Sequence, residues 1–109
     1  MSTEKLNTIF DKFKDKFEGA FHSVLWKLMI NHDATDRLKA FTPCLTDQGI
    51  VLGIAHKDLA GYTPSLAYFK PDTYHKDATS ICEELNREVF GLTPREANKI
   101  VLSSMLTNK

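Results

Sequence analysis

Apolar residues recur every three or four positions through residues 3–30, with polar or charged residues between them. This is the spacing of one face of an amphipathic helix. The apolar positions of the stretch are Leu6, Ile9, Phe10, Phe13, Phe17, Ala20, Phe21, Val24, Leu25 and Leu28. The pattern therefore predicts one long helix over residues 3–30.

A helix of this length does not fit within so small a domain. At about 1.5 Å per residue it would extend roughly 42 Å. A compact chain of 109 residues is only about 35 Å across. We therefore expect part of the helix to overhang the domain, to bend at Gly19, or to pack on another molecule.

The middle of the chain has the pattern of strands. Residues 48–56 are rich in β-branched side chains, and residues 65–70 are short and aromatic. Residues 40–45 fit an edge strand, because Pro43 is tolerated there. Since two strands alone are marginal in water, three antiparallel strands are favoured over two. Before them, Asp33 is expected to cap a short helical turn that begins at Ala34.

Two further helices are predicted after the strands. Thr73 or Asp72 can cap the first, and Gly91 is placed to end it in a left-handed conformation. The inward face of this helix comprises Tyr74, Ala78, Ile81, Cys82, Leu85 and Val89. Thr93 and Glu96 form a capping box for the second helix. Its inward face comprises Ala97, Ile100, Val101 and Met105.

These elements predict an α+β fold as one domain over residues 1–109. A long N-terminal helix would pack on a small two- or three-stranded antiparallel sheet, followed by two C-terminal helices. Trp26 lies off the apolar stripe of the first helix, so we expect one of the C-terminal helices to cover it.

The composition of the chain narrows the range of functions that it can have. Lysine and arginine total 14, as do aspartate and glutamate, so the formal net charge is zero. A neutral chain lacks the general attraction to phosphate of nucleic-acid binders, and we expect no nucleic-acid partner. No apolar run approaches the roughly 18 residues that span a bilayer, and no signal-peptide core is present. We therefore expect a cytoplasmic protein with no membrane association, in which Cys44 and Cys82 are buried thiols.

Charges on the first helix favour an interface. The basic residues Lys5, Lys12 and Lys16 fall on one edge of the apolar stripe, with Lys27 close by, and the acidic residues Glu4, Asp11, Asp15 and Glu18 fall on the other. Two copies of the helix packed in parallel would set these opposite edges together. We predict Phe10, Phe13, Lys16 and Phe17 as partner-binding residues, either in a homodimer or with another protein. The alternative is that the stripe faces the chain's own core and the charges form a solvated rim.

Two other binding functions remain open. Aromatic side chains on a sheet can stack nucleobases, and the candidates for such contacts are Lys57, Tyr62, Tyr68 and Lys70. Packing in the core and at its rim also accounts for these rings. The third possibility is a small-molecule site between the helix and the sheet. The four histidines are scattered without metal-ligand spacing, and no phosphate loop or catalytic motif is present. We expect no metal, no cofactor and no enzymatic activity.

Three segments of the C-terminal half carry a resemblance: GYTPSLAYF at 61–69, EELNREVFGL at 83–92 and EANKIVLSSM at 96–105. In these segments the chain resembles small proteins of unassigned function that bacterial plasmids and phages carry. The resemblance implies a protein that acts by binding a host protein, for example as an inhibitor of a bacterial defence system. It transfers no site residues.

Overall fold

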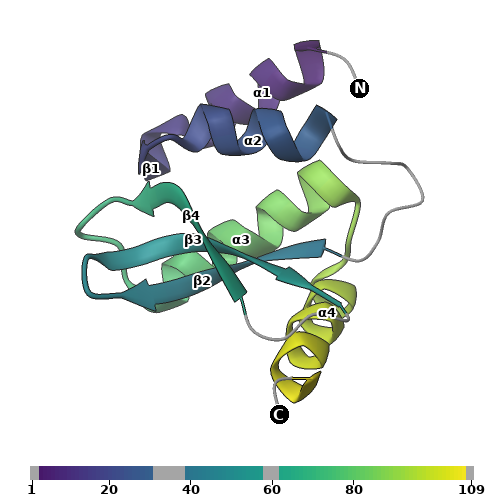
Figure 1. Ribbon diagram of the computed structural model, residues 1–109. Coiled ribbons are helices and arrows are strands. Elements are labelled where there is room, and N and C mark those ends of the chain that lie inside the picture. The colour runs from purple at the N-terminus through teal and green to yellow at the C-terminus, as the bar shows by residue number, and fades with distance from the viewer. Residues whose placement is uncertain (1–2, 31–38, 58–61, 108–109) are drawn as a thin grey trace.

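The computed structural model describes residues 3–30, 39–57 and 62–107, and within them the chain has an α+β fold (Figure 1). The elements are α1 (Thr3–Phe13), the 3-10 helix η1 (Lys14–Lys16), β1 (Phe17–Gly19), α2 (Phe21–Ile30), β2 (Lys39–Thr46), β3 (Gly49–His56), β4 (Tyr62–Phe69), α3 (His75–Phe90) and α4 (Pro94–Thr107). The helical turn predicted from Ala34 lies outside the described residues. None of the helices in the described ranges is long and apolar enough to cross a membrane.

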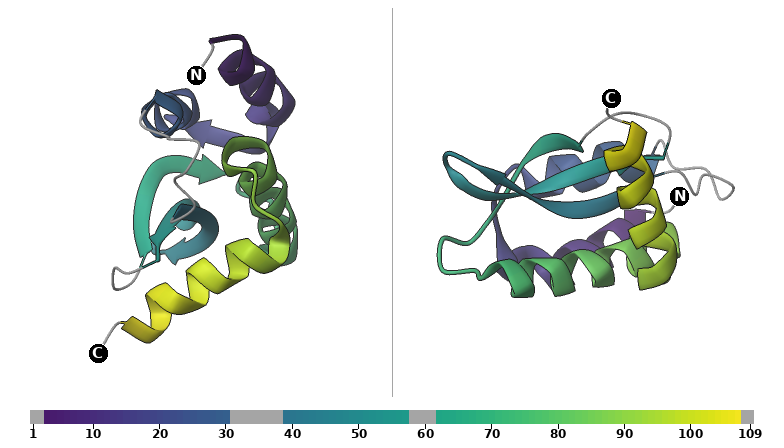
Figure 2. Two further views of the ribbon diagram at one scale, coloured as in Figure 1. Left: turned by 90° about the vertical axis from the view of Figure 1, so that its right-hand side faces the viewer. Right: turned by 90° about the horizontal axis from the view of Figure 1, so that it is seen from below.

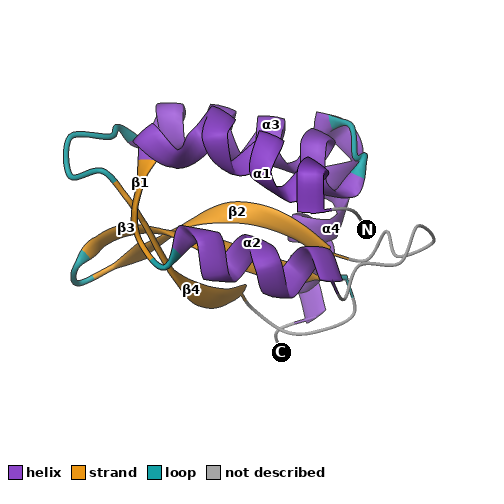
Figure 3. Ribbon diagram, turned by 90° about the horizontal axis from the view of Figure 1, so that it is seen from above, coloured by secondary structure: helices purple, strands orange, loops and turns teal. Residues whose placement is uncertain are grey.

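The predicted continuous helix over residues 3–30 is wrong. The chain leaves the helical conformation after Phe13, forms one turn of 3-10 helix and the strand β1, and then enters α2. As a result α1 and α2 lie side by side on the same side of the sheet (Figures 1 and 3). The molecule measures 37 × 34 × 20 Å, so the two short helices fit where one long helix would have overhung.

Hydrogen bonds to β4 hold the break in place. β1 pairs antiparallel with β4, with Phe17 opposite Phe69. At one end the Lys70 N–H donates to the Lys16 carbonyl at 3.2 Å, and at the other the Ala20 N–H donates to the Leu66 carbonyl at 2.9 Å. Backbone groups that a helix would have satisfied internally are thus satisfied by the sheet.

Gly19 is where the chain turns from β1 into α2. Its φ of +77° lies in the left-handed region that side chains disfavour. A Cβ atom at this position would lie 2.5 Å from the Leu66 carbonyl oxygen and 2.6 Å from the ring of Tyr68. The backbone of β4 therefore approaches Gly19 more closely than any side chain would allow.

The sheet has four antiparallel strands in the order β1-β4-β3-β2. The strands predicted at 40–45, 48–56 and 65–70 are present as β2, β3 and β4, with shifted ends. The prediction of two or three strands is wrong by one, because β1 lies inside the segment assigned to the first helix. Pro43 lies in β2, which is an edge strand as predicted.

Asn86 of α3 protects the free edge of β2. The Phe41 N–H donates to Asn86 Oδ1 at 2.6 Å, and Asn86 Nδ2 donates to the Phe41 carbonyl at 3.1 Å. Both backbone groups of Phe41 therefore point away from β3, and alternation places the nitrogen of Pro43 on the same outer edge. Pro43 has no N–H to leave unpaired there. The Asn86 amide satisfies the edge groups of Phe41 and Pro43 offers no N–H, so these positions are not open to pairing with a further strand.

The core lies between the sheet and the helices α1, α2 and α3. Phe17 stacks on Phe21 at 4.2 Å between ring centroids and lies 4.6 Å from the ring of Phe69. On the α3 side, the rings of Phe41 and Phe90 are 5.1 Å apart. Figure 2 shows α4 at the opposite end of the molecule from α1. The helix α2 packs on β4 and α1 packs on α2, whereas α3 and α4 both pack on β2.

Several predictions for the helices are corrected by the structure. Trp26 is 43% exposed, so no C-terminal helix covers it, and Tyr74 and Met105 are exposed rather than inward-facing. Ser104, which is fully buried, takes the inward position predicted for Met105. The helix α3 begins at His75 after Tyr74, rather than after Thr73 or Asp72.

The predicted C-terminal end of α3 and the predicted start of α4 are confirmed. Gly91 has a φ of 68° and follows the last residue of α3. The Glu96 N–H donates to Thr93 Oγ1 at 3.1 Å, and the Thr93 N–H donates to Glu96 Oε1 at 3.0 Å. This reciprocal pair is the capping box that the sequence predicts.

Replacing Gly19 by alanine should lower the free energy of unfolding by about 3 kcal/mol or more, since it adds a steric clash to an unfavourable φ. Gly91→Ala is the matched control: its φ is also positive, but nothing lies within 4 Å of the added Cβ. That variant should lose only about 1 kcal/mol. Urea denaturation measures both, and equal losses would contradict the close approach of β4.

Asn86→Leu should lower the free energy of unfolding by about 3 kcal/mol, because it leaves the buried N–H and carbonyl of Phe41 without partners. Asn7→Leu, at an exposed position of α1, should change it by no more than about 0.5 kcal/mol. Thermal and urea unfolding compare the two variants. An Asn86→Leu protein as stable as the wild type would show that the amide does not protect the edge.

Candidate functional site

The structure separates the four residues predicted to bind a partner. Phe13 and Phe17 are only 3% and 5% exposed, and both belong to the core. Phe10 is partly buried against the rings of Phe21 and His22. The expectation of exposed phenylalanines is wrong for Phe13 and Phe17, because the reversal at β1 folds this stretch onto the chain's own sheet. The surface on which the predicted interface was based is therefore not present.

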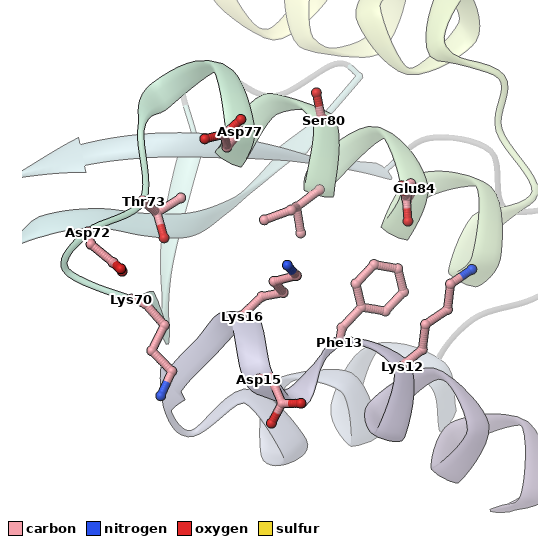
Figure 4. A pocket seen from close by; sticks show the side chains of 11 residues that line it. Lys12, Phe13, Asp15, Lys16, Lys70, Asp72, Thr73, Asp77, Ser80 and Glu84 are labelled. Carbon is pink, nitrogen blue, oxygen red and sulfur yellow. The ribbon is translucent and has the colours of Figure 1, made fainter.

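Lys16 remains exposed, in a groove between α1, η1 and α3 that we call the α1–α3 groove (Figure 4). Its volume is about 630 Å³. The lining residues are Lys12, Phe13, Asp15, Lys16, Lys70, Asp72, Thr73, Asp77, Ser80, Ile81 and Glu84. The side chain of Lys16 points across the groove toward α3, whereas that of Asp15 points away (Figure 4).

The walls of the α1–α3 groove carry both signs of charge. Lys12 forms an ion pair with Glu88 at 3.1 Å, and Lys70 lies 3.9 Å from Glu18. These groups are solvent-exposed, so each pair contributes little to stability. Small-molecule sites are mostly apolar and enclose their ligands. An open groove with charged walls does not have this character.

The residues considered for nucleic-acid binding do not form one surface. Tyr68 lies opposite Val51 in the β3–β4 pairing, and Lys57 follows the far end of β3. Six residues of strand separate Val51 from Lys57, or about 20 Å. Lys70 is engaged with Glu18, and the side chain of Tyr62 lies outside the described residues. A continuous basic and aromatic groove is therefore not formed by Lys57, Tyr68 and Lys70.

The helix α4 carries a feature that the sequence analysis missed. Leu102 and Met105 are 46% and 54% exposed and lie three residues apart, hence on one helix face. The partly buried Val101 adjoins them. We call Val101, Leu102 and Met105 the α4 ridge. The available signal was Leu102, which lies outside the inward stripe predicted for this helix.

Contacts on the other side of α4 fix the ridge in place. Ala97, Ile100 and Ser104 are buried. Ser103 Oγ donates a hydrogen bond to the Lys57 carbonyl at 2.5 Å. Because this side is held against the sheet, the exposed apolar side chains cannot turn inward without undocking the helix.

A second groove lies beside the α4 ridge. This α3–α4 groove has a volume of about 380 Å³ and runs over the free edge of β2. Its lining residues are Phe41, Thr42, Pro43, Thr79, Cys82, Glu83, Asn86, Pro94, Arg95, Ala97, Asn98 and Val101. Val101 belongs to both features, so the groove and the exposed apolar side chains of α4 adjoin each other.

No group of three or more His, Cys, Asp or Glu side chains that could hold a metal ion is found in the part of the chain that the structure describes. Comparison with protein-family models, with curated proteins and with solved structures finds no match to this chain.

The two cysteines should differ in reactivity. Both are free thiols; Cys82 is buried, whereas Cys44 is partly exposed. Burial raises the pKa of the Cys82 thiol well above its ordinary value, and the negative charge of Glu83 adds to the effect. Since the thiolate is the reactive species, a disulfide reagent should label Cys44 in the native protein and Cys82 only on unfolding. Mass spectrometry after timed labelling measures both rates. Equal rates would contradict the burial of Cys82.

Proposed function

We propose that this protein is a non-enzymatic interaction module of the cytoplasm that binds another protein molecule through the α4 ridge. The observation that carries the proposal is the exposure of Leu102 and Met105 on one face of a helix that is docked by its other face. Large apolar side chains that gather on a surface are characteristic of binding sites. Met105 adds a flexible side chain of the kind found at adaptable interfaces.

The position of the α4 ridge supports recognition of a helix. The ridge adjoins the α3–α4 groove, whose floor includes Phe41 and Pro43. An amphipathic helix can place its apolar face in such a groove and contact the ridge at the same time. Strand addition at this edge is disfavoured, since Asn86 already occupies the backbone groups of Phe41. The resemblance to mobile-element proteins makes a host protein, such as a component of a defence system, one class of partner.

The test compares variants of the α4 ridge with a control elsewhere on the surface. Leu102→Asp and Met105→Lys alter the ridge, whereas Leu45→Asp changes a more exposed leucine near the end of β2. Tagged proteins are cross-linked in cells of the source organism, purified, and their partners quantified by mass spectrometry. The ridge variants should capture a specific partner about tenfold less than the wild type. Leu45→Asp should capture it normally.

Circular dichroism and thermal unfolding verify that each variant folds. Folded ridge variants that retain the partner would overturn the proposal, as would a wild-type protein that captures no partner and forms no oligomer.

A further inference from the structure

On the basis of the proposed function, we propose that the α4 ridge binds a second copy of this chain, with the two α4 helices packed antiparallel about a twofold axis. The helix displays a seam suited to such a pair. Arg95, Asn98, Leu102 and Met105 follow one another at intervals of three, four and three residues, and all four are exposed. This is the interval of the buried seam in two-helix coiled coils.

The charges of α4 favour an antiparallel partner. Arg95 and Lys99 lie in the first half of the helix, where the helix dipole is positive, and no basic residue lies in the last turn. Neither side chain has an ion-pair partner within the described residues. In the antiparallel register proposed below, Arg95 lies beside the negative end of the other helix, whereas Lys99 lies near its middle. A parallel pair would instead place like charges together.

The shape of the surface agrees with the same arrangement. The α3–α4 groove borders the first half of α4, through Pro94, Arg95 and Asn98, whereas Leu102 and Met105 lie in the second half. An antiparallel partner lays its second half over the first half of this helix. Each pair of exposed apolar side chains then meets the groove of the other copy, as a twofold interface requires.

The proposed register sets the seam residues of the two helices opposite one another in layers. With Asn98 opposite Leu102 of the partner subunit, Arg95 lies opposite Met105 of the partner subunit. The methylene stem of Arg95 can cover the methionine while its guanidinium reaches the negative helix end. This arrangement replaces the parallel pairing of N-terminal helices that the sequence favoured, which would require Phe13 and Phe17 to be exposed.

The interface is small, so the dimer should be weak. The helix α4 has 14 residues and is about 21 Å long. One such helix pair buries less than the roughly 800 Å² per partner of a standard interface. We therefore expect dimers that form at micromolar protein concentrations and dissociate on dilution.

Two substitutions at one position separate this proposal from a general loss of apolar surface. In the antiparallel register, Met105→Lys places a cation beside Arg95 of the partner subunit and should weaken dimerisation. Met105→Glu places a carboxylate there and should preserve it. The double variant Arg95→Glu/Met105→Lys restores opposite charges and should recover the dimer, which no folding defect would produce.

Sedimentation velocity from low to high micromolar concentration measures each association constant, with Leu45→Asp as the control. We expect a wild-type dimer that Met105→Lys weakens by about tenfold or more. Equal losses for Met105→Lys and Met105→Glu would overturn the antiparallel register, and a dimer that neither changes would overturn the role of the ridge.

Failure of the dimer is distinguishable from failure of the proposed function. A wild-type protein that stays monomeric at every concentration overturns the dimer. If the same protein loses its cross-linked cellular partner on Met105→Lys, the α4 ridge still binds a protein of a different sequence.

Discussion

The pairing of β1 with β4 is the constraint on which the rest of the molecule depends. The three-residue strand β1, which ends at the left-handed Gly19, converts one amphipathic stretch into two helices that lie on the same side of the sheet. The rings of Phe13 and Phe17 enter the core only because the chain reverses there. A continuous helix would have left part of this apolar surface in water, at a cost of about 25 cal/mol per Å². The reversal therefore removes these two rings from the molecular surface.

Sequence periodicity predicted the composition of the fold better than its topology. The β-branched run of β3, the left-handed Gly91 and the capping box at Thr93 are local signals, and each has its expected place. The break in the first helix could not be read in this way. Its apolar spacing continues in phase through β1, because Phe17 serves the core as a strand residue just as it would have done in a helix. Gly19, where a bend was one of the expectations, marks the end of β1. The strand conformation before it depends on hydrogen bonds to β4, whose residues are distant in sequence.

The candidate site follows from the same distinction between local and distant contacts. The sequence identified Phe13 and Phe17 as large side chains for a partner, but both pack in the chain's own core. On α4, hydrophobicity predicts that Met105 is buried and Ser104 exposed, whereas in the structure Ser104 is buried and Met105 is exposed. The hydrogen bond from Ser103 to the Lys57 carbonyl helps to set the rotation of this helix, and no pattern within the helix encodes it. Asn86 and Pro43 close the edge of β2, and the exposed apolar side chains of the α4 ridge lie beside that edge.

Nuclear Overhauser contacts across β1 and β4 test the reversal most directly. The bonds from Lys70 to Lys16 and from Ala20 to Leu66 make Phe17 and Phe69 a non-hydrogen-bonded pair. The Hα atoms of such a pair lie close together. The account predicts a strong contact between the Hα atoms of Phe17 and Phe69, with extended-chain carbon shifts at residues 17 and 18. Helical shifts and contacts between residues three apart through 13–21, without the contact between Phe17 and Phe69, would contradict it.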